Sequence, residues 1–114
     1  MESILTSIKK LLGIAEDYEA FDTDIIIHIN SALMVMNQLG IGVKGYVIDS
    51  KENTWEDFLG STENVDAVKT VVYLRVRLAF DPPANSFVTS AIQEMIKEYE
   101  WRLNVQVDPG EETE

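Results

Sequence analysis

The sequence predicts an all-α protein, a small bundle of four to five helices, and three observations support this fold class. Apolar residues recur at helical spacing in four blocks along the chain. A short segment that begins with a helix-capping residue, 54–59, lies between the second and third blocks. The pair Pro82-Pro83 separates the third block from the last. With 114 residues, of which 46% are hydrophobic, the chain can form one domain with a modest core.

The first predicted helix covers residues 3–12 and has one apolar face. The residues of that face are Ile4, Leu5, Ile8, Leu11 and Leu12. Gly13 follows at the position where a left-handed residue commonly ends a helix. Residues 15–20 then form an acidic linker.

The second predicted helix runs from Asp22, a candidate N-cap, to a stop at Gly40. Asp24 lies in its first turn, where a negative charge interacts favourably with the helix dipole. One face is formed by Ile25, Ile29, Ala32, Leu33, Met36 and Leu39. Further apolar residues lie outside that face, namely Ile26, Ile27, Met34 and Val35. A helix this widely apolar is expected to be packed on most sides, and part of its surface is available for a partner.

The segment between the second helix and residue 53 is less regular. Gly40, Gly42 and Gly45 indicate turns. The β-prone residues Tyr46, Val47 and Ile48 predict either a short edge strand or an extended arm. Thr54 then caps a short helix that ends at Leu59, with the aromatic residues of this segment pointing inward.

The third block, 64–80, fits two periodicities. Alternation of Val72, Leu74, Val76 and Leu78 with polar or aromatic residues resembles a strand. A helical stripe is equally present and consists of Val65, Val68, Val72, Val76 and Ala79. The block is much longer than a typical strand of about five or six residues, so we predict a largely buried helix. It ends at Asp81, because the residue before a proline avoids helical geometry.

The last block predicts a helix over residues 85–103. Its apolar face consists of Val88, Ile92, Met95, Tyr99 and Leu103. Glu98 and Arg102 stand four residues apart in the order that favours an ion pair. We therefore expect a helical domain over residues 1–103, followed by a flexible acidic tail over 104–114.

The charge balance restricts the possible partners. Nine basic and 20 acidic residues give a net charge of −11, whereas DNA-reading proteins depend on Lys and Arg that meet phosphates. Such acidity keeps a small protein soluble, and it would also suit a surface past which DNA slides without being held. The chain has no run of 18 apolar residues, so no membrane association is expected.

No pattern of catalytic or metal-binding residues is present. There is no cysteine, and His28 is the only histidine, so a thiolate site or a second imidazole ligand is excluded. The acidic residues of 16–24 lack the spacing and the central glycine of a calcium loop. No glycine-rich phosphate loop and no nucleophile elbow occurs. We expect no enzyme activity, no catalytic residue, no metal and no cofactor.

Two arginines and two tryptophans are the candidates for contacts between subunits. Arg75 and Arg77 interrupt an apolar block and, two residues apart on a helix, point about 200° away from each other. Each arginine either pairs with an acid of the same chain or forms an ion pair across an interface. Trp55 and Trp101 are expected to anchor either the core or an interface.

The order of these segments resembles the head–tail connector (adaptor) proteins of tailed bacteriophages and their prophage relatives. The most specific pieces are the Trp-Glu-Asp-Phe-Leu segment at 55–59, the run from Tyr73 to Pro83, and Glu100-Trp101-Arg102-Leu103. Asp22-Thr23-Asp24 at the start of the second helix adds to them. The resemblance covers about residues 2–104.

The resemblance implies a structural virion protein without enzymatic activity. Such a protein forms a ring of about twelve subunits between the portal protein and the stopper or tail-completion protein. It would complete the head, support DNA packaging and retention, and provide the platform for tail attachment, while DNA passes through its channel without sequence-specific binding. Its place would be the head–tail junction of the virion, and the host bacterial cytoplasm during assembly. The residues that we expect in subunit or partner interfaces are Arg75, Arg77, Trp101, Tyr46, Val47 and Ile48.

A different class of protein would also fit the composition. A small acidic helical protein could bind one basic partner, as an antitoxin, an anti-repressor or a DNA mimic does. Such a protein would bind at a fixed stoichiometry and would not form a closed ring. A metal-dependent enzyme is the least supported alternative.

Overall fold

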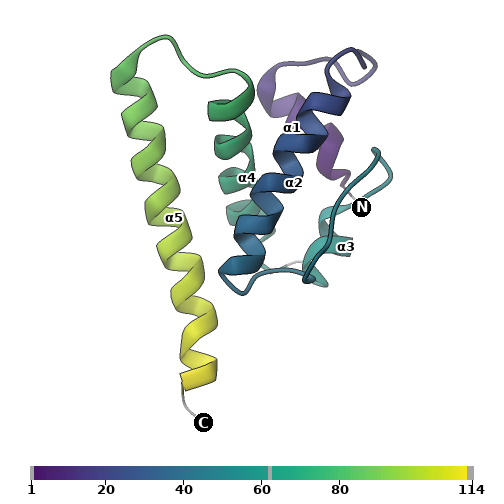
Figure 1. The fold of residues 1–114 in the computed structure, drawn as a ribbon. Coiled ribbons are helices and arrows are strands. Elements are labelled where there is room, and N and C mark those ends of the chain that lie inside the picture. The colour runs from purple at the N-terminus through teal and green to yellow at the C-terminus, as the bar shows by residue number, and fades with distance from the viewer. Residues whose placement is uncertain (1, 62, 113–114) are drawn as a thin grey trace.

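A computed structural model describes the backbone of residues 2–61 and 63–112, and the side chains of these residues up to 106. Over that range it contains five α-helices and no sheet, which confirms the predicted all-α bundle (Figure 1). The helices are α1 (Ile4–Leu12), α2 (Asp22–Gln38), α3 (Trp55–Leu59), α4 (Val65–Phe80) and α5 (Ser86–Glu112).

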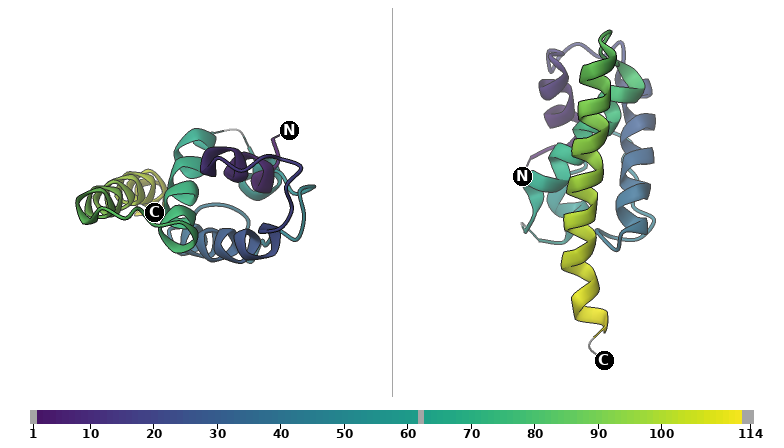
Figure 2. Two further views of the ribbon diagram at one scale, coloured as in Figure 1. Left: turned by 90° about the horizontal axis from the view of Figure 1, so that it is seen from above. Right: turned by 90° about the vertical axis from the view of Figure 1, so that its left-hand side faces the viewer.

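Helix α4 lies at the centre of the arrangement. Helices α1 and α2 pack against each other and against α4, and α5 packs against α4 from another side (Figure 2). The short α3 lies near the start of α1 (Figure 1). The long α5 extends beyond the rest of the bundle and contributes to overall dimensions of 48 × 35 × 19 Å.

The main core is formed by the first four helices, the segments between them and one residue of α5. Its buried members are Ile4, Leu5, Ile8, Ile25, Ile29, Ala32, Leu33, Met36, Ile41, Ile48, Trp55, Phe58, Val68, Val71, Val72, Val76 and Leu103. A smaller cluster between α4 and α5 consists of Leu74, Ile92 and Ile96. Leu103 is therefore the buried residue through which α5 joins the main core.

Helix α3 is fastened to the start of α1. The Thr54 hydroxyl accepts from the Asp57 backbone N–H at 3.1 Å, and the Asp57 carboxylate accepts from the Thr54 N–H at 3.2 Å, which completes a capping box. The Ile4 N–H donates to the Asn53 carbonyl at 2.9 Å, and an isolated bridge pairs Ser3 with Thr54. The predicted cap at Thr54 is confirmed.

A buried lysine fixes the linker between α1 and α2. Lys9 is 2% exposed, and its Nζ donates to the carbonyls of Glu16 at 3.0 Å and Tyr18 at 2.8 Å. The same ammonium lies 2.8 Å from Asp22 Oδ1. The prediction that Asp22 is an N-cap is wrong by one residue: the cap position is Phe21, and the Asp22 carboxylate pairs with Lys9 instead of capping backbone N–H groups.

The segment 41–53 forms no strand in the described structure, so the edge-strand alternative is wrong. Asn30 of α2 replaces a strand partner: its Oδ1 accepts from the Ile48 N–H at 2.8 Å, and its Nδ2 donates to the Ile48 carbonyl at 3.0 Å. Asn37 binds the backbone of Ile41, Val43 and Gly45 in the same manner. The segment therefore folds back along α2 instead of extending as an arm.

Gly42 allows this segment to approach α3. It has φ +83°, and a Cβ atom added there would lie 2.3 Å from Phe58 Cζ. Only glycine combines that backbone conformation with so close a contact to an aromatic ring.

Helix α4 confirms the helical interpretation of the third block. It spans Val65–Phe80 and buries five residues: Val68, Val71, Val72, Leu74 and Val76. The length of the block distinguishes the two structures, because the alternating pattern by itself is typical of a strand. The helix ends at Phe80 with Asp81 as its C-cap, before the two prolines, so the predicted stop at Asp81-Pro82-Pro83 is confirmed.

Helix α5 differs from the prediction in its end and in its buried face. It begins at Ser86, where Asn85 Oδ1 accepts from the Phe87 N–H at 2.7 Å, and it runs to Glu112 instead of ending at Leu103. Two tertiary contacts hold the added stretch: Asn104 Nδ2 donates to the Leu39 carbonyl at 3.3 Å, and Asn64 Nδ2 donates to Gln106 Oε1 at 2.9 Å. Residues 113–114 of the predicted tail lie outside the described residues.

The face that α5 buries is narrower than the predicted one. Ile92, Ile96 and Leu103 are buried, whereas Val88 and Met95 remain 43% exposed. Only α4 packs along most of α5. A single row of α5 side chains, one from each successive turn, is therefore sufficient to form the interface between the two helices.

Candidate assembly surfaces

Arg75 links two helices of the same chain. Its Nε lies 2.5 Å from Glu100 Oε2 of α5, in a pair whose side chains are 35% and 17% exposed. Of the two alternatives for this arginine, the intramolecular one is realised in the single chain. A role of Arg75 between subunits stays a prediction.

Arg77 points to a different side of α4, as its two-residue offset from Arg75 requires. Its Nη1 donates to the Tyr73 hydroxyl at 3.4 Å, which is a weak contact. Its Nε is buried and has no hydrogen-bond partner among the described residues. The guanidinium thus retains a donor for which the described chain supplies no acceptor, and its interface role also stays a prediction.

The two tryptophans have opposite environments. Trp55 is 2% exposed, and its Nε1 donates to Ser7 Oγ at 2.8 Å inside the core. Trp101 lies on the outer side of α5 with 67% of its side chain exposed, while nearby Tyr99 packs against the main core. Only Trp101 is accessible to a partner.

The three residues of the expected arm are also placed differently from one another. Ile48 is 2% exposed and belongs to the core, so it does not reach a partner from this conformation. The Tyr46 ring lies 5.7 Å from the Phe58 ring, centroid to centroid. Val47 is 61% exposed and is the one residue of the three that faces outward.

Large apolar side chains remain exposed at several places among the described residues, and two groups of them bear on assembly. The first, which we name the α5 outer face, comprises Phe87, Val88, Met95, Trp101 and Val105, and these side chains are between 40% and 85% exposed. The second, which we name the α2 groove, is a depression of about 370 Å³ between α2 and the segment 45–47. Its lining is formed by Asn30, Ser31, Met34, Asn37, Gly45, Tyr46 and Val47.

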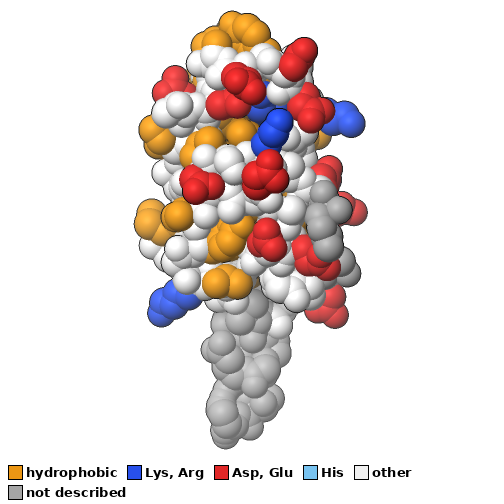
Figure 3. Space-filling model, turned by 90° about the vertical axis from the view of Figure 1, so that its right-hand side faces the viewer, with side chains coloured by type: hydrophobic (Ala, Val, Ile, Leu, Met, Phe, Trp, Pro, Cys, Tyr) orange, Lys and Arg blue, Asp and Glu red, His pale blue; other side chains and the backbone are white. Residues whose placement is uncertain are grey.

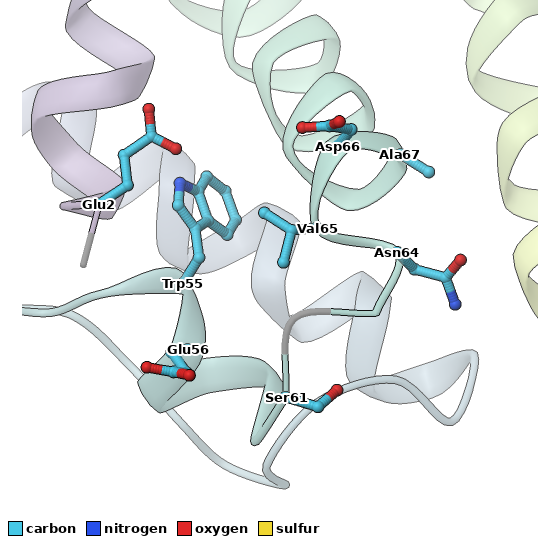
Figure 4. A pocket seen from close by; sticks show the side chains of 8 residues that line it. All are labelled: Glu2, Trp55, Glu56, Ser61, Asn64, Val65, Asp66 and Ala67. Atoms are coloured by element: carbon cyan, nitrogen blue, oxygen red, sulfur yellow. The ribbon is translucent and has the colours of Figure 1, made fainter.

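A further cleft lies near the start of α1. It measures about 580 Å³ and is lined by Glu2, Trp55, Glu56, Ser61, Asn64, Val65, Asp66 and Ala67 (Figure 4). Glu2 forms an ion pair with Lys69 at 3.0 Å, and the Trp55 Nε1 is already used by Ser7. The lining holds carboxylates and one serine but no histidine that could activate the serine, so the cleft does not form a nucleophile–base pair.

Sequence reasoning missed this cleft and also missed Lys9. The cleft unites residues from the N-terminus, α3 and α4, and no sequence spacing places these segments side by side. Lys9 follows Ile8 in an amphipathic helix, where an exposed lysine is the ordinary expectation. The proximity of the acidic linker 16–22 was the one available hint of a buried cation.

Acidic side chains dominate the surface beside α1 and α3. Figure 3 shows them spread over this face, with few basic side chains among them. In the part of the chain that the structure describes, no group of three or more His, Asp or Glu residues could hold a metal ion. No described helix is both long enough and apolar enough to cross a membrane.

Comparison with known proteins gives one match. A family model described as "Phage connector protein" matches residues 4–110. Neither the curated proteins nor the solved structures contain a match. The matched range begins in the first turn of α1 and ends inside α5, so it includes all five helices.

Proposed function

This chain belongs to the phage connector protein family, and we propose that it forms the ring that joins the portal to the stopper or tail-completion protein. A structural connector role follows from the family itself. The ring, its number of about twelve subunits and its named neighbours are the parts that we propose. The observation that carries the proposal is the family match over 4–110, which takes in the whole helical domain.

The uncovered apolar surfaces support assembly with further subunits. The α5 outer face includes Phe87 at 85% and Trp101 at 67% exposure, and large aromatic side chains of this kind are typical interface anchors. A chain that acted alone would leave both this face and the α2 groove in water. Neighbouring subunits in a ring would cover them.

The acidic surface supports a channel through which DNA passes without being held. Exposed acids are concentrated in two stretches, 16–24 and 49–66. Carboxylates repel phosphates, so a channel that presents them lowers the affinity for DNA. We propose that part of this acidic surface faces the DNA path of the head–tail junction.

Deletion of the gene in its native phage or prophage tests this function. We expect electron microscopy of the induced lysate to show free tails beside unjoined heads, some of which have lost their DNA. A plasmid copy of the wild-type gene should restore joined particles, and an empty plasmid is the matched control. Joined, infectious particles from the deletion strain would contradict the proposal and would favour the acidic partner-binding protein.

A further inference from the structure

Acidic residues are distributed unevenly along the chain, and this affects where two copies can associate. Residues 25–48 form most of α2 and the segment packed on it, and they contain no Asp or Glu in a chain with 20 acids. Lys44 is the only residue with a formal charge in this stretch when His28 is neutral. The α2 groove therefore lies in the longest part of the sequence that is free of Asp and Glu.

The part of α5 that carries the α5 outer face, residues 86–106, has little unpaired charge, although it contains three glutamates. Each carboxylate between residues 86 and 106 has a basic partner. The three pairs are Glu94 with Lys97 at 3.7 Å, Glu98 with Arg102 at 2.6 Å, and Glu100 with Arg75 at 2.5 Å. The α5 outer face therefore presents no unpaired carboxylate between residues 86 and 106 to a neighbouring subunit.

These two surfaces are the places where a second copy of an acidic chain meets least repulsion. Two copies that each carry a charge of −11 repel each other wherever their acidic stretches approach. Interface centres are depleted of charged residues and enriched in aromatic residues and Met. The α2 groove contains no charged residue, and the α5 outer face presents Phe87, Met95 and Trp101 beside the exposed pairs Glu94–Lys97 and Glu98–Arg102. The charge distribution therefore favours a contact between the α5 outer face of one copy and the α2 groove of another copy.

One surface carries a large exposed side chain, and the other is hollowed. Trp101 projects from α5 with 67% of its side chain exposed, whereas the α2 groove is a depression of about 370 Å³ beside Met34 and Val47. The segment 43–48 lies on the side of α2 away from α5 in both the front view and the view from above (Figures 1 and 2). A projection and a depression on opposite sides of one molecule suit a head-to-tail contact, which closes into a ring when the rotation permits.

We propose that the α5 outer face of one copy docks into the α2 groove of the next, with Trp101 inserted beside Met34 and Val47. This inference rests on the proposed connector function for its setting, the assembled head–tail junction. It adds which two surfaces make the contact between subunits and that the contact is heterologous. A two-fold contact of α5 with α5 would bring the same surface patch of both copies together and is a different arrangement.

The absence of cysteine from the sequence permits a direct test by crosslinking. Two differently tagged single-cysteine variants, Trp101→Cys and Met34→Cys, are expressed together in the deletion strain. Assembled heads are isolated, oxidised and separated under non-reducing conditions. We expect a disulfide-linked dimer that carries both tags, and we expect its loss when either variant is expressed alone.

The matched control replaces Met34→Cys with Glu52→Cys, an exposed position in the acidic stretch 49–66. Trp101→Cys and Glu52→Cys, expressed together, should give no disulfide-linked dimer. Equal dimer from the control pair would overturn the proposal, as would a dimer from Trp101→Cys alone. If the first two variants do not enter heads, the pair Val105→Cys and Val47→Cys tests the same contact at its edge, and absence of that dimer from assembled heads overturns the proposal.

Failure of the docking and failure of the connector function give different results. Unjoined heads on gene deletion, with no crosslink between the two surfaces in the complemented heads, overturn the docking alone. Normal particles on gene deletion overturn the connector function. In that case the same pairs are tested on the purified chain at high concentration, where a dimer with both tags supports the contact and its absence overturns it.

Discussion

Helices α2 and α5 both carry apolar residues outside the face that packs in the core, but their surroundings are very different. Helix α2 is packed by α1, by α4 and by the segment 41–48, which is fixed to it through Asn30 and Asn37. Helix α5 packs against α4 and contributes one buried residue, Leu103, to the main core. An apolar stripe therefore indicates that a helix face will be covered, but it does not say whether the cover comes from the same chain or from another.

The difference has an energetic consequence. The main core contains 17 buried residues, whereas the cluster between α4 and α5 contains three. Local opening of a protein is easiest where few apolar contacts must be broken. The N-terminal half of α5 is thus expected to open before α2. Substitutions in the main core should lower the free energy of unfolding more than substitutions in the cluster between α4 and α5.

The largest effect is expected for Phe58→Ala in the main core. Phe58 is fully buried against Gly42 and Tyr46, so its removal leaves a cavity and should lower the free energy of unfolding by about 3–5 kcal/mol. Urea unfolding followed by far-UV circular dichroism measures the change. Phe87→Ala, at a position that is 85% exposed, is the matched control and should change it by less than about 0.5 kcal/mol. Similar losses of unfolding free energy for Phe58→Ala and Phe87→Ala would contradict the burial of Phe58 in the main core.

A slightly smaller effect is expected for Lys9→Met. The substitution keeps the length of the apolar stem but leaves two backbone carbonyls and the Asp22 carboxylate without the ammonium, which should cost about 3 kcal/mol. Lys10→Met, one residue further and exposed, is the control. Thermal and urea unfolding of both variants would decide the point, and equal stability of Lys9→Met and the wild type would show that the linker is held without this contact.

A more local effect is expected for Ile96→Ala in the cluster between α4 and α5. Ile96 is 7% exposed and has few buried neighbours, so about 2 kcal/mol should be lost. Amide hydrogen exchange should accelerate over residues 86–96 more than over α2. Met95→Ala, at the exposed neighbouring position, should leave exchange nearly unchanged. Uniform acceleration in both helices would mean that α5 and the main core open as one unit.

The smallest effect on stability is expected for Trp101→Ala. Its side chain is mostly in water, so the free energy of unfolding of the single chain should change by less than about 0.5 kcal/mol. Urea unfolding at low protein concentration tests this expectation. A loss of more than 1 kcal/mol would indicate that Trp101 is part of the fold of the single chain.

Local signals in the sequence were sufficient for most helix positions. The capping box at Thr54 and the stop after Phe80 both depend on neighbours within a few residues, and both are present in the structure. The end of α5 could not be found in this way. Its extension beyond Leu103 is accompanied by side-chain contacts with Leu39 and Asn64, which are more than 40 residues away.

The candidate surfaces were predictable only in part. Trp101 and Val47 were named from residue type, and their side chains are exposed. Ile48 was named with them, but the hydrogen bonds from Asn30 turn the segment so that Ile48 is buried. The α2 groove was not predicted, because it exists only after the segment 45–47 has packed beside Met34.

The sequence by itself determined the helical class, the approximate position of each helix and the membership in a connector-like family. These properties depend on periodicity, capping and residue order, which are local along the chain. The tertiary structure decided that Lys9 is buried, that Arg75 pairs with Glu100, and which apolar residues of α5 remain in water. Those outcomes depend on distances between segments that are far apart in the sequence, and such distances are fixed only when the helices pack together.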